Sequence, residues 1–252
     1  METNRINDLK INGNGTSTGG LFRSIKINGN GNIKGDTDTL DLKVNGLGDF
    51  YGNVKIATGK IAGKGSVLGN INAQVLNVNG LLDVSGNLTV SDFNSNGQVE
   101  IGGKVSTENL VNRGILKVEG DCNSETFKSE GLFKIKGLLN SGTIEILLHH
   151  TSFAKEIGGD HINVRKGGSF EIKSFIKSLF PAFEMNLNLN TDSIEGDEIY
   201  LEYTKAKVVR GNNVNIGPGC EIDLVEYKNS FIHASNTKVA SAVQMVAGTK
   251  PL

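Results

Sequence analysis

Glycine recurs at a fixed interval of seventeen residues through the first half of the chain, and this repeat constrains the fold more than any other feature. One series steps by seventeen from Gly29 to Gly131, and a second steps by seventeen from Gly35 to Gly137. Gly13 and Gly19 precede these series by sixteen residues, so the first coil is one residue shorter. A fixed interval of this length is typical of a solenoid, in which each repeat forms one coil.

Apolar residues follow the same interval at three positions of each coil. The three ladders are Ile33, Phe50, Val67, Val84, Ile101, Val118 and Ile135; Val54, Ile71, Leu88, Val105, Cys122 and Leu139; and Leu42, Gly59, Leu76, Phe93, Leu110, Phe127 and Ile144. Around them apolar and polar residues alternate, as in strands with one buried face. We expect three short strands per coil, joined at corners by glycine and asparagine, which tolerate positive φ. The sequence therefore predicts an all-β fold, a single-stranded parallel β-helix with about seventeen residues per coil.

The coil is expected to be right-handed. A left-handed hexapeptide helix needs three equal sides of six residues, whereas seventeen residues divide as six plus eleven and leave one side short. Connections between parallel strands are also right-handed as a rule.

The periodicity divides the chain into a short N-terminal arm at 1–7, a solenoid at 8–233 and a flexible C-terminal tail at 234–252, which is small, polar and aperiodic. The strict interval lapses after Ile144, and the segment 147–190 is expected to interrupt or decorate the solenoid. Its apolar residues are Phe175, Ile176, Leu179, Phe180 and Phe183. We expect them to pack on the flank of the solenoid, with contact to a partner or a membrane as the alternative.

The seventeen-residue interval is expected to resume beyond this segment. The pairs that suggest it are Ile199 with Ile216, Val208 with Val225, and Gly142 with Gly159. One domain is therefore the economical interpretation.

The charge and the apolar content exclude several classes of protein. The 252 residues include 26 basic and 27 acidic ones, a balance that gives no attraction to nucleic acid. The first residues lack the apolar core of a signal peptide, and no stretch approaches eighteen uninterrupted apolar residues. We expect a cytoplasmic protein, at most peripheral at the inner face of the membrane.

No catalytic residue, cofactor or metal is predicted. The histidines are His149, His150, His161 and His233. Their spacing is not that of metal ligands. Cys122 lies in an apolar ladder and is expected in the core, and both it and Cys220 are expected to be free thiols. Asp49 and Asp83 are the nearest candidates for a pair of carboxylates that cleaves glycosides.

Glycine and asparagine patterns have structural explanations. The Gly-x-Gly pairs, such as Gly29 with Gly31, are not followed by a helix that could present its N-terminus to a phosphate, so they are expected to be corners. Two polar series are expected to stack as hydrogen-bonded ladders. They are Asn28, Asn45, Asn79 and Asn96, and Asp36, Asn53, Asn70 and Asn87.

The coils at residues 25–31 and 42–48 contain Lys-Ile-Asn-Gly-Asn-Gly and Lys-Val-Asn-Gly. With these motifs the chain resembles the bactofilins, which are bacterial polymer-forming cytoskeletal proteins, over about residues 8–145 and more loosely over 190–226. The resemblance implies a right-handed β-helix that assembles end to end into filaments without a nucleotide. It also implies a scaffold role in cell shape, envelope or appendage assembly, with proteins of those systems as partners. The chain departs from the family in having more coils and no apolar membrane-targeting stretch at its start.

The terminal coils are the expected sites of self-association, because they expose unpaired strand edges and uncovered core. The predicted polymerisation interface comprises Leu9, Ile11, Leu21 and Phe22 at one end and Leu224, Tyr227, Phe231 and Ile232 at the other. The alternatives are a monomeric or oligomeric binding or adhesin-like module and, ranked below it, a carbohydrate-active enzyme or acyltransferase. An enzyme would need a groove with clustered carboxylates, basic residues or a catalytic histidine, and the sequence shows no such cluster. An adhesin would need export.

Overall fold

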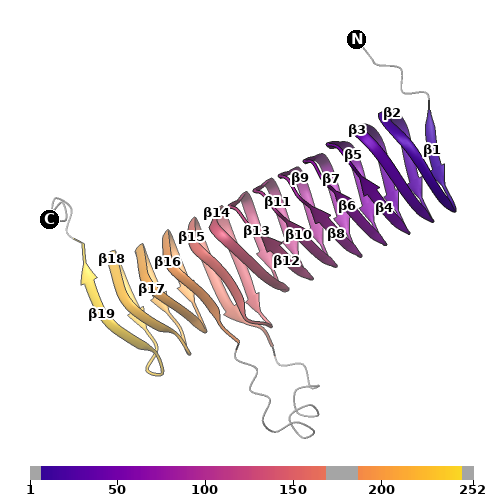
Figure 1. Cartoon of the computed structure of the whole chain (residues 1–252). Coiled ribbons are helices and arrows are strands. Elements are labelled where there is room, and N and C mark those ends of the chain that lie inside the picture. Colours follow the sequence, from indigo (N-terminus) through magenta and orange to yellow (C-terminus); the bar gives the residue numbers. More distant parts are fainter. Residues whose placement is uncertain (1–6, 169–186, 246–252) are drawn as a thin grey trace, which may run out of the picture.

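The computed structural model describes residues 7–168 and 187–245, which form an all-β parallel solenoid of about 13 turns (Figure 1). Most coils take roughly 17 residues, and the described ranges contain no helix. The strands β1 and β19 lie at opposite ends of the rod (Figure 1). At about 4.8 Å per coil, the rod is about 60 Å long. The predicted fold class is confirmed, and the right-handed sense of the coil stays a prediction.

All described strands pair in parallel with the coil before or after them. Their bounds are β1 Asp8–Ile11, β2 Asn14–Ile27, β3 Asn30–Val44, β4 Leu47–Phe50, β5 Val54–Ile61, β6 Lys64–Val67, β7 Ile71–Val78, β8 Leu81–Val84, β9 Leu88–Ser95, β10 Gln98–Ile101, β11 Val105–Asn112, β12 Ile115–Val118, β13 Cys122–Ser129, β14 Leu132–Leu148, β15 Ser152–Lys166, β16 Leu189–Leu201, β17 Thr204–Ile216, β18 Glu221–His233 and β19 Lys238–Gln244.

Each regular coil has three sides, as the sequence predicts. In the coil of β4 and β5, the first side is β4, the second side is 54–56 and the third side is 58–61. Ala57 falls outside the pairing register between the second and third sides, where β5 bends. We use first, second and third side for the corresponding segments of every coil.

The apolar ladders form one continuous core along the axis of the rod. Every member that bears a side chain, from Ile33 to Ile144, is at most 3% exposed. Cys122 is among these fully buried residues, as predicted. Because each strand buries alternate side chains, every coil adds its apolar residues to the core of its neighbours.

Close stacking explains most members of the glycine series, and positive φ explains Gly35, which narrows the expectation from the sequence. Among the described glycines, positive φ occurs at Gly20, Gly35 and Gly219. A β-carbon on Gly63 would instead lie 2.0 Å from the carbonyl oxygen of Gly46, the equivalent glycine one coil earlier. Any side chain at these corners would therefore force successive coils apart.

In two inward-facing columns of the core, the size of the side chains changes in opposite directions along the rod. In the early coils, Gly31, Gly48 and Gly65 share the interior with Ile27, Val44 and Ile61. In later coils the same two columns hold Val99, Leu116 and Phe133 with the small polar residues Ser95, Asn112 and Ser129. Large side chains in one column are thus matched by small ones in the other, which keeps the core filled.

The predicted asparagine ladders are confirmed. The Nδ2 of Asn45 donates to Oδ1 of Asn28 at 2.8 Å, and Ala62 then interrupts that series. In the second ladder, Oδ1 of Asn53 accepts hydrogen bonds from the backbone N–H of Asn70 at 2.9 Å and from its Nδ2 at 3.0 Å. The second ladder therefore satisfies backbone N–H groups at the corners, whereas the first links side chains of successive coils.

The seventeen-residue interval returns in the last coils, where Asn213 pairs with Ser230 and Glu221 with Lys238, but the residue pairs that predicted it are wrong. Ile199 pairs with Val214, fifteen residues on, and not with Ile216. Val225 pairs with Val209, not with Val208. Gly159 pairs with Gly196 across the long segment, and Gly142 is not aligned with Gly159, because the step between β14 and β15 in this region is eighteen residues.

The expected domain boundaries also shift. Most of the described part of the predicted irregular segment 147–190 is strand, because β15 continues the solenoid to Lys166 and β16 begins at Leu189. The apolar cluster Phe175, Ile176, Leu179, Phe180 and Phe183 lies outside the described residues. The predicted tail at 234–252 contains β19, which pairs with β18 from Glu221 to Tyr227. Alternating small residues in this segment add a further partial coil that their low hydrophobicity had obscured.

Candidate assembly ends of the solenoid

The N-terminal end carries a partial coil. β1 forms the third side and pairs with 24–27 of β2. Among the described residues, no strand pairs with the outer edge of β1 or with the outer edge of 14–22, the first and second sides of β2. Within the described residues, these edges thus offer main-chain groups with which another strand could pair.

All four predicted N-terminal interface residues lie at or next to this end. Leu9 and Phe22 are partly buried against the core, although their columns are fully covered in later coils. Ile11 is 7% exposed, and Leu21 faces outward with 46% of its surface exposed. The end thus offers apolar surface together with unpaired edges.

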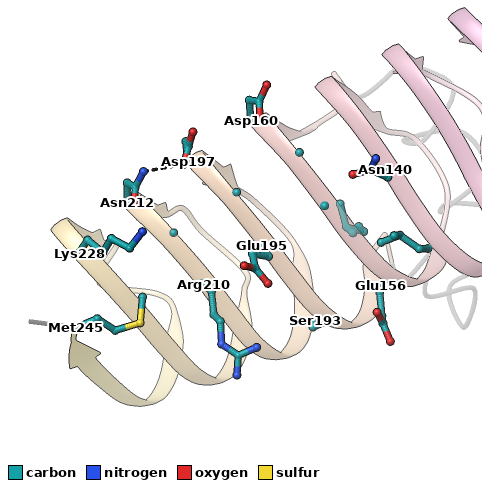
Figure 2. A pocket seen from close by; sticks show the side chains of 16 residues that line it. Asn140, Glu156, Asp160, Ser193, Glu195, Asp197, Arg210, Asn212, Lys228 and Met245 are labelled. Atoms are coloured by element: carbon teal, nitrogen blue, oxygen red, sulfur yellow. Dashed lines mark hydrogen bonds between the residues drawn. The ribbon is translucent and has the colours of Figure 1, made fainter. Parts of the chain in front are cut away.

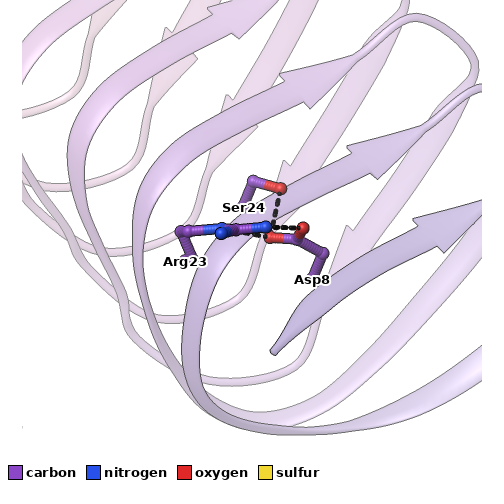
Figure 3. A network of polar contacts seen from close by, with 3 residues as sticks. All are labelled: Asp8, Arg23 and Ser24. Atoms are coloured by element: carbon purple, nitrogen blue, oxygen red, sulfur yellow. Dashed lines mark hydrogen bonds and ion pairs between the residues drawn. The ribbon is translucent and has the colours of Figure 1, made fainter. Parts of the chain in front are cut away.

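A charged network fastens β1 to the rest of the solenoid (Figure 3). The Oδ1 of Asp8 accepts hydrogen bonds from Nε of Arg23 at 3.0 Å and from Oγ of Ser24 at 2.9 Å. A second Arg23 nitrogen, Nη2, donates to the other oxygen of Asp8. These hydrogen bonds, first that of Arg23 and then that of Ser24, lower the pKa of Asp8 from its ordinary value. Sequence analysis missed this network, because its members are fifteen and sixteen residues apart and nothing in their types marks them.

The C-terminal end also carries a partial coil, formed by β19. Lys238 and Val239 continue the first side, and 241–244 continue the second side. Among the described residues, no strand covers β19 or the third side of β18, which is 230–233. The C-terminal end therefore has the first and second sides raised by one strand and the third side left low.

This arrangement corrects part of the predicted C-terminal interface. Leu224 and Tyr227 are half-buried and pair with Ser241 and Gln244 of β19, so they lie one coil inside the end. Sequence analysis missed Val239, which packs partly buried on the core, and Val243, which is 50% exposed. No pattern marked them, because Val239 faces the core, Val243 faces outward and the residues between them are small.

Phe231 and Ile232 do lie at the C-terminal end, as predicted. Phe231 occupies the inward column of the third side and is partly buried, whereas its neighbour in the previous coil, Val214, is 1% exposed. Its ring lies 5.5 Å from those of Tyr227 and His233. Ile232 faces outward and is 62% exposed. The N- and C-terminal groups lie at opposite ends of one rod, so they can meet only between subunits (Figure 1).

A groove of about 650 Å³ crosses the C-terminal coils (Figure 2). Gly159, Gly196 and Gly211 lie in register along it. Figure 2 shows Asp160, Asp197 and Asn212 along one edge and Glu195 and Arg210 on the other side. The sequence showed no such cluster, because these residues are brought together by coils of fifteen and thirty-seven residues rather than seventeen.

Several polar groups of the groove already bond to other residues of the chain. Nδ2 of Asn212 donates to Oδ1 of Asp197 at 2.7 Å. Arg210 forms an ion pair with Glu226 of the next coil. The glycines are explained by stacking, since a β-carbon on Gly196 would lie 2.3 Å from the carbonyl oxygen of Gly159. The groove can therefore accept an extended polar ligand, but its glycines are accounted for without one.

Other candidate chemical residues are dispersed or buried. Asp49 and Asp83 lie on the first side two coils apart, with Ser66 between them in the same column. Burial raises the pKa of Cys122 to about 12 and that of Cys220 to about 11, and both thiols are free. Within 7–168 and 187–245, no group of three or more His, Cys, Asp or Glu residues is arranged to hold a metal ion. In the same ranges no helix is long and apolar enough to cross a membrane.

Comparison with known proteins finds two partial relatives. The chain is 44% identical over 82 residues to the uncharacterized protein YhbF of Bacillus subtilis (strain 168), a match that covers 32% of this chain and 30% of YhbF. It is 36% identical over 96 residues to the uncharacterized protein YhbE of the same organism, which covers 37% of each chain. The matches thus span about a third of each relative's length. No family model matches the chain, and no solved structure does so either.

Proposed function

We propose that the chain is a structural, polymer-forming scaffold protein that assembles end to end into filaments, in the manner that its resemblance to bactofilins implies. The observation that carries this proposal is where the incompletely covered core lies. Among the described residues, six apolar ones pack on the core while remaining partly exposed, and four of them lie at the ends: Leu9, Phe22, Phe231 and Val239. Stacking a second subunit on either end would bury them.

The driving force in this proposal is apolar burial combined with new main-chain hydrogen bonds between strand edges. Neither contribution needs a nucleotide, so assembly is expected without ATP or GTP. As a cytoplasmic scaffold, the filament would present the flanks of the rod to other cytoskeletal, envelope or appendage-assembly proteins. Its place in the cell and these partners are parts of the proposal.

A ligand-binding solenoid is the second candidate function, and the groove is the observation that favours it. Four carboxylates line the groove, and they belong to Glu156, Asp160, Glu195 and Asp197. Arg210 and Lys228 add two cationic groups. This candidate needs no self-association, so the oligomeric state separates it from the filament proposal.

Sedimentation velocity of the purified chain, measured over a range of protein and salt concentrations, tests the proposal. The wild type is expected to form large species, and Ile11→Arg and Phe231→Arg are expected to convert them into short ones by placing charge in the joined ends. Leu21→Arg repeats the test at an outward-facing residue of the N-terminal end that the fold does not need. Thr89→Arg adds the same charge to an exposed position in the middle of the rod and should leave assembly intact. Equal effects of all four substitutions would contradict assembly through the ends.

A further inference from the structure

The two ends of the rod have complementary shapes in the described part of the chain. At the N-terminal end the third side, β1, stands one strand above the other two sides. At the C-terminal end the first and second sides, both from β19, stand one strand above the third side. Each end is therefore a step, and the raised part of one step corresponds to the low part of the other.

We propose that subunits join head to tail, so that β1 of one subunit completes the coil that β19 of the preceding subunit begins. This inference rests on the proposed end-to-end assembly and adds its polarity. The described chain ends its last coil on the second side, at Gln244, and the next subunit starts on the third side, at Asp8. The order of first, second and third sides thus continues through the join without interruption.

Symmetric joins cannot bring all three sides into contact at once. Two N-terminal ends have one raised side each, so at least one of the three sides would lack a strand between them. Two C-terminal ends have two raised sides each. On at least one side the raised strands of both subunits would meet, and they would keep another side from making contact. A side held apart leaves its main-chain donors and acceptors unpaired across the join, at a cost for each group that is shielded from water. The head-to-tail join fills each side with one strand.

Several side chains also match when the columns of the solenoid are continued across the join, whereas Ile11 falls on His233 and Phe22 on Gln244. Leu9 falls on Phe231, and both belong to the inward column of the third side and are partly buried. Leu21 falls beside Val243 in an outward column of the second side, where they are 46% and 50% exposed. Gly20 falls on Ala242, so the smallest residues of the two ends also coincide.

Charged groups at the join are compatible with this register. Asp8 falls on Ser230, whose hydroxyl can donate a hydrogen bond to the carboxylate. Lys10 falls beside Ile232 in an outward column, where its stem can cover the exposed side chain while its ammonium stays in water. No like charges meet on the third side.

Disulfide cross-linking tests the polarity of the join. Neighbouring residues of one column lie about 4.8 Å apart, within the range that a disulfide can bridge. The variant with both Leu21→Cys and Val243→Cys should, after mild oxidation of the assembled protein, give a ladder of covalent dimers, trimers and longer species. Each single variant should stay monomeric on a non-reducing gel. Cys122 and Cys220 are at most 1% exposed and can stay in place.

A matched control combines Leu21→Cys with Leu68→Cys, which is 57% exposed on the flank of the rod and should give no ladder. Electron microscopy of the same samples separates the two proposals. Filaments that give disulfide dimers in either single variant, or no ladder in the double variant, would overturn the head-to-tail join and leave end-to-end assembly standing. Samples without filaments and without cross-links would overturn the assembly itself and, with it, this inference.

Discussion

A β-carbon placed on Gly97 would lie 1.9 Å from the carbonyl oxygen of Gly80, the equivalent residue one coil earlier. Non-bonded heavy atoms do not approach so closely, so the corners of successive coils can stack only if the later residue of each pair is glycine. The same contact recurs at the corner of every regular coil, with distances of 1.9 to 2.2 Å. The seventeen-residue glycine series is therefore a steric requirement of the close stacking of the main chain.

Gly97→Ala is expected to lower the free energy of unfolding by several kcal/mol, because two coils must separate locally to admit the methyl group. Gly13→Ala is the control, since nothing lies within 4 Å of a β-carbon at that position. Thermal melting compares the two. Equal melting temperatures would show that the corners are not closely stacked.

Val84→Asp is expected to destabilise the solenoid by about 3 to 5 kcal/mol, because Val84 is fully buried in the core and the carboxylate would find no partner there. Leu81→Asp, on the same strand but 47% exposed, should change stability by less than about 0.5 kcal/mol. Urea unfolding of both variants checks the assignment. A stable Val84→Asp protein would mean that the ladder faces solvent.

Ser95→Ala is expected to leave stability unchanged or to raise it by up to about 1 kcal/mol, because the Oγ of Ser95 is buried without a hydrogen-bond partner. Ser129→Ala should cost about 1 to 2 kcal/mol, since its Oγ accepts from Nδ2 of Asn112 at 3.0 Å and donates to the carbonyl oxygen of Gly131 at 3.2 Å. Both residues belong to the same buried column. Similar losses of unfolding free energy in the two variants would show that the two hydroxyls do not differ in their hydrogen bonding.

Acid should release the first strand. The pKa of Asp8 in the folded protein is lowered from its ordinary value of 3.8, first by the hydrogen bond from Arg23. At pH values above 3.8 the ionised carboxylate of Asp8 therefore stabilises the pairing of β1. This stabilisation is lost as the pH falls below 3.8 and through the still lower pKa that Asp8 has in the folded protein. Amide protection factors of β1 should fall at pH 3 relative to pH 7. Asp8→Asn should show weaker protection at pH 7 and little further change at pH 3; a variant that behaves as wild type at both pH values would remove Asp8 from this role.

The first half of the solenoid was predictable because sequence and structure repeat together there. From Ile33 to Ile144 the interval is constant, so the ladders identify the inward residues, the three sides and the polar columns. The function of the glycines was not predictable in the same way. The constant interval shows where glycine is needed. Whether the backbone angle φ or a neighbouring carbonyl oxygen requires the glycine depends on how closely the coils stack.

The C-terminal coils misled the sequence analysis for a physical reason. Strands alternate with a period of two, so steps of fifteen and seventeen residues both connect inward-facing positions. Ile199 reaches Val214 by one step and Ile216 by the other, and both are buried. The groove lies across these irregular coils, which is why the sequence did not predict it. Leu9, Ile11, Leu21 and Phe22 do lie at or next to the N-terminal end of the rod, and their role in an interface stays a prediction.

Cryo-electron microscopy of the purified chain, without nucleotide, tests end-to-end assembly most directly. About 13 turns per subunit at about 4.8 Å per coil predict unbranched filaments of single-rod width with an axial repeat of about 60 Å. A protein that stays monomeric at high concentration in both low and high salt, or filaments whose subunits contact one another along their flanks rather than through β1 and β19, would contradict the account.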